Sequence, residues 1–226
     1  MSAVLLSGGL DSAVLLAQEA ERGVVQPIYV GVGLAWEPAE RMALAQFLAE
    51  GTARPAVRPL VSLTVDMTDV YPSGHWAVQG RPPAYHTPDE DVYLPGRNVV
   101  LLGKAAVYCS VSGIARLVLG ILDHNPFPDA TPAFRAAMTA ALSLGLGHSL
   151  EIDAPFAHLR KAEVVRRGLA LSVPLELTLS CMSPVNTPSL PRHCGVCSKC
   201  RERHGAFVEA GCLDPTRYED RRYVGA

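Results

Sequence analysis

The chain has 226 residues, of which 49% are hydrophobic and 19% are charged. This balance excludes an intrinsically disordered chain, and the length allows one α/β domain with a small appendage. The formal net charge is −2 and no block of like charge occurs, so we do not expect nucleic acid as a partner. No apolar run is long enough to cross a membrane or to serve as a signal peptide, and we therefore expect a cytoplasmic protein without membrane contact.

The first recognisable pattern is residues 3–14, which read Ala-Val-Leu-Leu-Ser-Gly-Gly-Leu-Asp-Ser-Ala-Val. The apolar start predicts a buried parallel strand over 3–6, and the apolar positions that recur further on predict a helix over 11–22. A strand that turns through glycines into a helix binds anions well, because the first helical turn has unpaired backbone N–H groups. Glycine also lets the backbone approach phosphate oxygens closely.

Asp11 is the unusual residue of this turn, because a carboxylate repels bound phosphate unless a cation lies between them. We therefore expect a Mg²⁺ ion shared by Asp11 and a pyrophosphate group. The alternative is an ordinary strand-to-helix turn in which Asp11 or Ser12 is the N-cap. The nucleotide-binding residues predicted here are Leu6, Ser7, Gly8, Gly9, Leu10, Asp11 and Ser12.

A second strand is predicted over 24–32. In a doubly wound sheet, ligands lie beyond the carboxyl ends of the strands, so the backbone around Val32 is placed to receive an adenine ring. An ordinary strand end with a glycine turn is the alternative. A helix over 38–50 and a third strand over 59–65 follow.

Residues 71–96 are rich in proline and glycine and show no helical period. So long an irregular stretch in a compact domain is usually a functional loop or a lid, and a disordered insertion is the alternative. Tyr85 and His86 are suited to stacking on a flat heterocycle, and we predict that they contact the substrate.

Arg97 and Asn98 stand at the start of an apolar helix that is predicted over 99–110. Both side chains suit phosphate or carboxylate binding, and an ordinary surface position is the alternative for Arg97. A fourth strand is predicted over 114–121 and leads into a second Pro-rich loop. In that loop Asp123 and Asp129 are predicted substrate contacts, with turn formation as the alternative.

The remaining predicted elements are a helix over 131–144, a short strand over 149–152 and a helix over 161–169. Lys161 begins the last helix and could reach the β and γ phosphates of a nucleotide as a point charge. The alternative is a solvated lysine in a first turn, where the helix dipole slightly disfavours it. The pattern as a whole predicts an α/β chain with a doubly wound, mainly parallel sheet over 1–175 and a small zinc-binding segment over 176–226.

Four of the six cysteines fall close together near the C-terminus, and these are Cys181, Cys194, Cys197 and Cys200. Gly195 permits the tight turn of a metal knuckle, and four thiolates around one Zn²⁺ ion form a closed structural site. An iron–sulfur cluster and a redox-active or persulfide-carrying cysteine are the alternatives. His193 and His204 flank the site and could replace a ligand.

Residues 7–12 resemble the SGGxDS pyrophosphate loop of the N-type ATP pyrophosphatases. Together with four later segments they are similar to the 7-cyano-7-deazaguanine synthase (QueC) family. Those segments are Leu-Pro-Gly-Arg-Asn at 94–98, His-Leu-Arg-Lys-Ala-Glu at 158–163, Cys-Gly-Val-Cys-Ser-Lys-Cys at 194–200, and the short motifs within 205–211. The resemblance runs in order along almost the whole chain.

The resemblance implies an adenine nucleotide alpha hydrolase-like fold and an ATP-dependent C–N ligase of queuosine biosynthesis. Such an enzyme adenylates 7-carboxy-7-deazaguanine, forms the amide with ammonia, and dehydrates the amide to the nitrile. The resemblance implies ATP, Mg²⁺ and Zn²⁺ as cofactors, a homodimer, and catalytic roles for Asp11, Lys161 and Arg97. No glutaminase domain is evident, so ammonia would be free or delivered by a partner.

The sequence departs from the family pattern in two places, at 33–37 and at 127–134, where Thr131 and Ala133 replace a charged pair. These changes leave open a paralogue that joins a deazaguanine carboxylate to another amine, including one on a macromolecule. A tRNA sulfur transferase is a second alternative, although it would need a basic RNA surface and an exposed catalytic cysteine. A non-enzymatic nucleotide-binding protein would be favoured if Asp11 and Lys161 lay far apart.

Overall fold

The computed structural model describes residues 1–50 and 55–224, and within these ranges a parallel sheet of five strands forms the centre of the chain. The strands are β1 (Ser2–Leu5), β2 (Val25–Gly31), β3 (Val61–Thr64), β4 (Arg116–Val118) and β5 (Glu151–Asp153). Their order across the sheet is β3-β2-β1-β4-β5, and neighbouring strands are parallel. The topological switch point therefore lies between β1 and β4, where ligands of such sheets bind.

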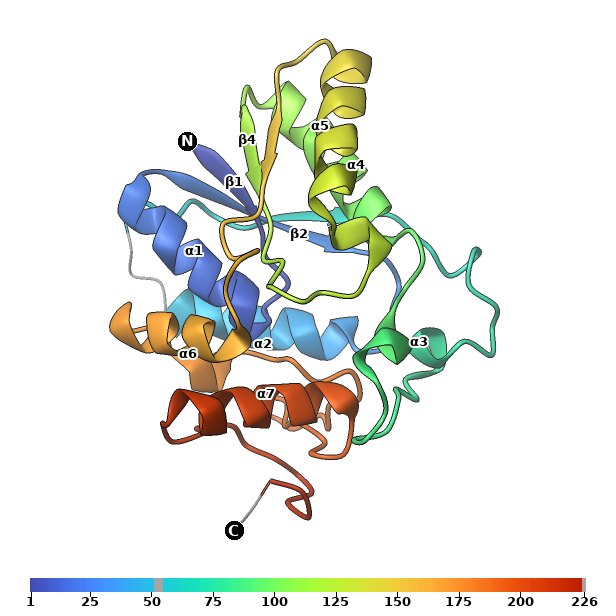
Figure 1. Cartoon of the computed structure of the whole chain (residues 1–226), viewed down its shortest axis with the longest axis vertical. Coiled ribbons are helices and arrows are strands. Elements are labelled where there is room, and N and C mark those ends of the chain that lie inside the picture. Colours follow the sequence, from blue (N-terminus) through green and yellow to red (C-terminus); the bar gives the residue numbers. More distant parts are fainter. Residues whose placement is uncertain (51–54, 225–226) are drawn as a thin grey trace.

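Helices cover both faces of the sheet (Figure 1). The bounds are α1 (Leu10–Arg22), α2 (Glu37–Glu50) and α6 (Lys161–Ala170) on one face, and α4 (Arg97–Val111) and α5 (Pro132–Leu146) on the other. Successive side chains of β1 point to opposite faces, so Val4 joins the core beneath α1 and α6 whereas Ala3 joins the core beneath α4. The predicted doubly wound α/β fold is confirmed.

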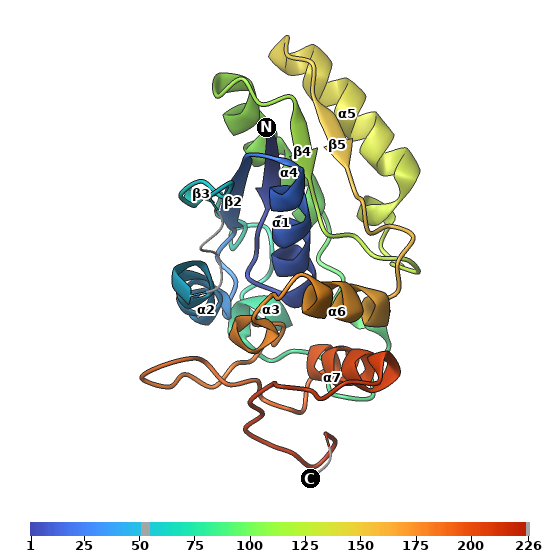
Figure 2. The same ribbon diagram turned by 90° about the vertical axis from the view of Figure 1, so that its left-hand side faces the viewer.

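Helix α7 (Ser198–Ala210) lies beyond the carboxyl ends of the strands and packs on α6 (Figure 2). The sequence-based prediction does not include this helix. One reason is that its buried face includes Arg203, which is fully buried and so breaks the apolar pattern. The Arg203 guanidinium donates to the Thr216 and Thr178 hydroxyls and to the Leu175 carbonyl, at 2.6, 2.9 and 2.7 Å. These bonds satisfy a charge that burial would otherwise make costly.

The long segment 71–96 has its own small core within the described residues. It contains a short helix, α3 (Trp76–Gln79), and a 3₁₀ turn, Asp89–Val92. The Trp76 ring stacks on the Trp36 ring, with the centroids 5.7 Å apart. The alternative of a disordered insertion is therefore wrong, because buried apolar side chains fix this segment.

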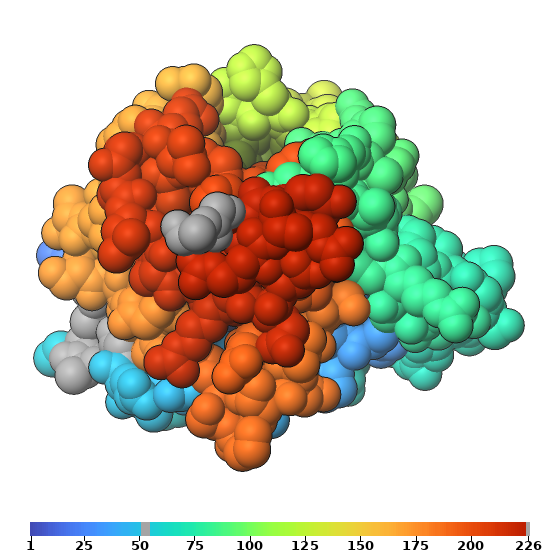
Figure 3. Space-filling model, turned by 90° about the horizontal axis from the view of Figure 1, so that it is seen from below, coloured from blue at the N-terminus to red at the C-terminus, as the bar shows by residue number. Residues whose placement is uncertain are grey.

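The same segment is tied to the C-terminal part of the chain. The Arg201 guanidinium donates to the carbonyl oxygens of Tyr85 and Thr87, at 2.8 and 2.6 Å, and the Ser198 N–H donates to the Pro83 carbonyl at 3.2 Å. Seen from below, the red C-terminal residues lie against the green residues of this segment (Figure 3).

Most predicted boundaries hold to within a few residues, and the predicted fourth strand is the main exception. The prediction over 114–121 is too long, because only Arg116–Val118 pairs in the sheet. The division into 1–175 and 176–226 stays a prediction, and residues 225–226 lie outside the described part. None of the helices in the described ranges is long and apolar enough to span a membrane.

Candidate active site

The turn between β1 and α1 has the geometry of an anion site. Gly8 has φ +83°, and a Cβ there would lie 3.3 Å from the Leu44 Cβ of α2, so glycine is required. The Gly9 N–H donates to Ser7 Oγ at 3.2 Å, and Ser12 Oγ donates to the Gly9 carbonyl at 3.0 Å. Because α1 begins directly after the turn, the positive end of its dipole faces the same space as these hydroxyls.

A row of four charged side chains, with alternating sign, crosses from α1 to α7. Lys161 Nζ donates to Asp11 Oδ2 at 2.9 Å and to Glu202 Oε1 at 2.8 Å. Lys199 Nζ donates to Glu202 Oε2 at 2.6 Å. Burial alone would lower the pKa of Lys161, but the carboxylates of Asp11 and Glu202 outweigh it and hold that pKa above its ordinary value. Asp11 and Lys161 are therefore in contact, which removes the observation that would have favoured a non-enzymatic protein.

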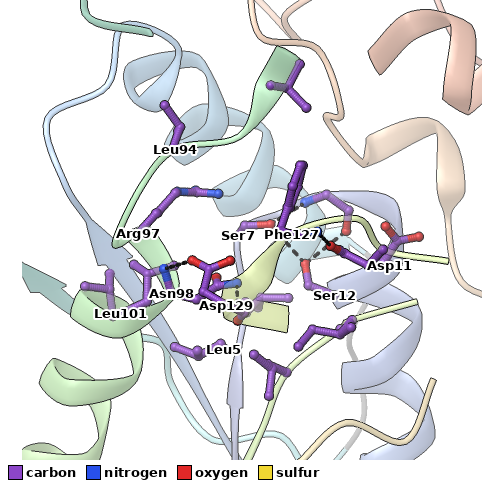
Figure 4. A pocket seen from close by; sticks show the side chains of 18 of the residues that line it. Leu5, Ser7, Asp11, Ser12, Leu94, Arg97, Asn98, Leu101, Phe127 and Asp129 are labelled. Carbon is purple, nitrogen blue, oxygen red and sulfur yellow. Dashed lines mark hydrogen bonds between the residues drawn. The ribbon is translucent and has the colours of Figure 1, made fainter. Parts of the chain in front are cut away.

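Two adjoining cavities of ≈ 270 and ≈ 390 Å³ open onto this row and form one cleft. The first lies against the ends of β1 and β2 and against α4, and the second reaches Lys161 and Glu202. Asp11, Arg97 and Lys199 line both cavities. In Figure 4, Arg97 and Asp129 lie on one side of the first cavity and Asp11 lies on the other.

A buried carboxyl group lines the same cavities as Arg97. Glu40 of α2 is 7% exposed, and its Oε2 accepts a hydrogen bond from Tyr29 Oη at 2.8 Å. Burial raises the pKa of Glu40 to about 7, although the Arg97 charge and the Tyr29 hydroxyl oppose this shift. Among the described residues, Arg97 Nε is buried without a hydrogen-bond partner, which leaves donor capacity for a ligand.

Asp129 is the second buried carboxyl group of the cleft and is held by Asn98. The Asn98 N–H donates to Asp129 Oδ2, and the Asn98 side chain donates to the Asp129 carbonyl, both at 3.1 Å. Burial raises the pKa of Asp129, against these hydrogen bonds and the Arg97 charge. Within the described ranges Asp129 Oδ1 is buried and has no partner, so it can accept a hydrogen bond from a bound molecule.

The structure brings most of the predicted site residues together. Those that line the cleft are Leu6, Ser7, Gly9, Leu10, Asp11, Ser12, Arg97, Asn98, Asp123, Asp129 and Lys161. Gly8 shapes the turn between β1 and α1 but lines neither cavity, and the remaining three predicted residues lie elsewhere. The Val32 N–H is occupied by Glu37 Oε1 at 2.7 Å, and Tyr85 and His86 line a separate hollow beside Tyr223. The binding roles given to these three residues stay predictions without support from the cleft.

The two altered segments lie mostly outside the cleft. Thr131 and Ala133 are exposed at the start of α5, where Thr131 Oγ1 accepts the Phe134 N–H and acts as the N-cap. In the other altered segment, Trp36 lines the second cavity while Leu34 is buried in the core of the 71–96 segment. The loss of the charged pair at 131 and 133 therefore does not change the walls of the cleft.

The four clustered cysteines fit a single tetrahedral metal ion. Zn–S bonds of about 2.3 Å require sulfur atoms roughly 3.8 Å apart. The Sγ atoms of Cys181 and Cys197 lie 3.9 Å apart, and those of Cys194 and Cys200 lie 3.8 Å apart. Backbone N–H groups of residues 183 and 194 also donate to Cys181 Sγ, as expected for a thiolate. The cluster could therefore bind zinc, as predicted.

The histidines that flank this cluster have other partners. His193 Nε2 accepts the Ser180 N–H at 3.1 Å, and His204 Nδ1 contacts Asp214 Oδ2 at 3.0 Å. Gly195 has φ +82°, and a Cβ there would overlap the Asp220 carbonyl, so only glycine fits the knuckle.

The sequence-based site prediction does not include Glu40, Lys199 and Glu202, charged residues that line the cleft. Glu40 lies on the buried face of α2 with Ala43 and Phe47. A charged residue at an apolar position of a helix indicates a functional residue, so the sequence does contain a signal for Glu40. Lys199 and Glu202 belong to a helix that the sequence pattern does not indicate, so no comparable signal exists for them.

A glycine turn with Asp11 and Lys161, a doubly wound sheet and a cysteine cluster define a nucleotide-using α/β protein with a metal knuckle. The model of the queuosine biosynthesis protein QueC matches residues 1–211, and the chain belongs to this family. Family membership carries with it the pyrophosphate loop and the use of ATP, and it confirms the resemblance found in the motifs.

Proteins named 7-cyano-7-deazaguanine synthase are among the similar sequences. Those from Anaeromyxobacter dehalogenans (strain 2CP-C) and Anaeromyxobacter sp. (strain Fw109-5) are each 35% identical, over 95% of this chain and 94% of theirs. The protein from Nitrosococcus oceani is 33% identical, over 95% of this chain and 96% of its own. A solved structure described as a predicted subunit of tRNA methyltransferase from Methanocaldococcus jannaschii has a TM-score of 0.47 and 15% identity, and covers 98% of this chain and 93% of its own. That likeness is too weak to support an argument.

Proposed function

We propose that this chain is an ATP-dependent C–N ligase that converts 7-carboxy-7-deazaguanine and ammonia into 7-cyano-7-deazaguanine. The names of the relatives above support the choice of reaction. The observation that carries the proposal is the contact between Lys161 and Asp11, which are 150 positions apart, at the glycine turn. Adenylation needs a cation and a metal-binding carboxylate at one pyrophosphate site, and this contact supplies both.

In the first step, a carboxylate oxygen of the deazaguanine attacks the α-phosphorus of ATP, and the bond to the β-phosphate oxygen breaks. Pyrophosphate leaves with the bonding electron pair, and the acyl adenylate remains. Negative charge grows on the leaving oxygen. The backbone N–H groups that follow Gly8, the Lys161 ammonium and the Arg97 guanidinium are the donors that would stabilise it.

In the second step, ammonia attacks the acyl carbon, AMP leaves, and one proton is released with formation of the amide. The amide oxygen then attacks a second ATP in the same way, with loss of pyrophosphate and a proton. Loss of the remaining N–H proton, as AMP departs, gives the nitrile. No side-chain nucleophile is needed, so the residues of the cleft bind, orient and stabilise charge.

Two metals belong to the proposal. Asp11 Oδ1 is buried and has no hydrogen-bond partner among the described residues, and a free carboxylate oxygen is the ligand that Mg²⁺ prefers. Mg²⁺ held there would neutralise phosphate charge. The four cysteines would hold Zn²⁺ as a structural ion. Free ammonia as the nitrogen source and assembly as a homodimer complete the proposal.

The test is incubation of the purified protein with ATP, Mg²⁺, ammonium and 7-carboxy-7-deazaguanine, followed by mass spectrometry. We expect AMP and the nitrile, and we expect Asp11→Asn to lose at least about 100-fold in AMP release because it removes a carboxylate charge at the reacting centre. Asp69→Asn, at an exposed residue outside the cleft, is the matched control. Amide or adenylate without nitrile would instead favour a paralogue with another amine as acceptor. No AMP from folded, zinc-loaded protein would contradict the proposed substrate.

A further inference from the structure

The use of lysine in this chain is unusual. Lysine and arginine together number 20, and only three of these are lysines, at positions 104, 161 and 199. Lys104 is exposed on α4. The other two meet in the cleft, where both donate to the carboxylate of Glu202. A chain that uses arginine at most of its basic positions thus places two compact ammonium groups, which bind phosphate as point charges, beside the glycine turn.

Lys199 stands where the helix itself does not favour a cation. It is the second residue of α7, and a positive charge in a first turn opposes the helix dipole. Lys199 forms an ion pair with Glu202, three residues later. On an exposed surface such a pair contributes too little to offset the unfavourable interaction of Lys199 with the helix dipole. The Lys199 side chain is only 22% exposed, and it lines both cavities of the cleft. Local helix stabilisation therefore does not account for its position.

The charges of the row explain what Lys199 adds. Lys161 is flanked by the carboxylates of Asp11 and Glu202, which lie 2.9 and 2.8 Å from its ammonium nitrogen. These three groups alone would carry a net charge of −1, which repels a phosphate. Lys199 contacts the other carboxylate oxygen of Glu202, which brings the net charge of the four groups to zero. Each carboxylate is then balanced by one ammonium group, so the row no longer repels a phosphate.

We propose that Lys199 is a second cation of the pyrophosphate site, which binds the β and γ phosphates of ATP together with Lys161. This inference rests on the proposed function of the cleft as an ATP site. Lys199 lies between the metal-binding cysteines Cys197 and Cys200, so a bound metal ion fixes its backbone on both sides. The zinc knuckle thus delivers a phosphate-binding residue to the cleft, in addition to holding the C-terminal segment.

The first test is amine labelling of the wild-type, zinc-loaded protein with an acetylating reagent, with and without Mg²⁺ and inorganic pyrophosphate. Because the chain has three lysines, mass spectrometry can follow each of them. We expect pyrophosphate to slow the labelling of Lys199 and Lys161 at least fivefold, and to leave Lys104 unchanged. Protection of Lys161 without protection of Lys199 would overturn the inference.

The second test compares the affinity of variants for Mg²⁺-pyrophosphate and for ATP by calorimetry. We expect Lys199→Met to weaken both by about tenfold, Lys199→Arg to weaken them less because the charge remains, and Lys104→Met to have no effect. Zinc content and the unfolding midpoint show whether each variant is intact. If Lys199→Met does not fold, the labelling result decides. Unchanged affinity in intact Lys199→Met would also overturn the inference.

The two proposals fail separately. If the wild-type protein binds pyrophosphate through Lys199 but makes no nitrile, the assigned substrate is wrong and the role of Lys199 stands. If it makes the nitrile and Lys199→Met binds ATP normally, the reaction stands and the role of Lys199 is wrong.

Discussion

Asp129 shows how a single buried carboxyl group could choose a substrate. Its Oδ2 accepts the Asn98 N–H, while Oδ1 is unpaired and buried in the wall of the first cavity. A buried acceptor of this kind discriminates strongly, because a ligand without a matching donor leaves it unsatisfied. The 2-aminopyrimidinone edge of a deazaguanine carries adjacent N–H donors that would match it.

We therefore predict that Asp129→Asn raises the KM for 7-carboxy-7-deazaguanine at least about tenfold, a loss of roughly 1.4 kcal/mol. The amide would set an N–H donor against the N–H donors of Asn98 or of the substrate. ATP affinity should change little, since Asp129 does not line the second cavity, which reaches Lys161. Steady-state kinetics with each substrate varied in turn measures the KM for 7-carboxy-7-deazaguanine and the KM for ATP separately. Equal losses for both substrates would argue against a role in base recognition.

At the scale of single residues, the sequence revealed the groups that sit in short, unusual strings. Asp11 and its glycines could be predicted because glycine and a carboxylate at a strand end have few other uses. Glu202 and Lys199 could not, since Glu202 matters through a contact with Lys161, 41 positions away, and Lys199 matters through its contact with Glu202. The ring chemistry of Tyr85 and His86 predicts substrate contact, but both residues line a separate hollow, because residue type alone does not show which way a side chain points.

At the scale of elements, the β1–α1 turn depends on Gly8. We predict that Gly8→Ala destabilises the protein by about 1–2 kcal/mol, because alanine is strained at φ +83° and its methyl group would press on Leu44. Gly103→Ala is the control, for which we expect the free energy of unfolding to change in the opposite direction. Gly103 lies inside α4 with open space around it, and alanine there should stabilise by about 0.5–1 kcal/mol. Urea unfolding measures both, and equal effects of the two changes would contradict the argument.

Glu40 on α2 gives a prediction for pH. Its pKa rises on folding from the ordinary 4.5 to about 7, so the folded state holds a proton that the unfolded state has lost between these values. Stability should therefore fall as pH rises from about 4.5 to 7, by at most on the order of 3 kcal/mol from this group. Glu40→Gln keeps an acceptor for the Tyr29 hydroxyl and removes the titratable group. Urea unfolding between pH 5 and 8.5 should show that the free energy of unfolding of the variant increases relative to that of the wild type as pH rises. Parallel curves of unfolding free energy against pH would contradict the prediction.

Elements with a strong apolar period could be placed from the sequence, and those held by polar contacts could not. The strand at Val25–Gly31 and the helix at Pro132–Leu146 lie close to their predicted ranges. Helix α7 was missed because its buried positions include a cysteine and an arginine, which are fixed by the metal knuckle and by hydrogen bonds. The short helix and turn of 71–96 depend on side chains from elsewhere in the chain, namely Trp36 just before α2 and Arg201 of α7.

At the scale of the whole molecule, the cysteine cluster connects the C-terminal segment, the 71–96 segment and the cleft. We predict one zinc ion per chain by metal analysis, and loss of the metal in Cys194→Ser. Cys212→Ser should keep it, because Cys212 lies outside the cluster and its thiol contacts the Phe207 carbonyl instead.

Removal of the metal should loosen distant parts of the chain by different amounts. Hydrogen exchange should rise over 181–200 and over 83–89, since Arg201 and Ser198 hold the second range to α7. Helices α4 and α5, on the far face of the sheet, should keep their protection. A uniform rise in exchange, or none over 83–89, would show that the knuckle does not anchor that segment.

The contact of Arg201 with Thr87 spans 114 positions, and it has a consequence for synthesis of the protein. Strands β1 to β5 are complete once residue 153 has been made, but the anchor for 83–89 appears only with α7. Translation at about 5–20 residues per second separates residues 87 and 201 by roughly 6–23 s. During that interval a growing chain can pair its sheet while residues 83–89 lack their hydrogen bonds to α7. A ribosome that stops between residues 153 and 198 would therefore release a chain with a complete sheet that lacks Lys199 and Glu202 of the charged row. We expect such a product to be degraded and to have no activity.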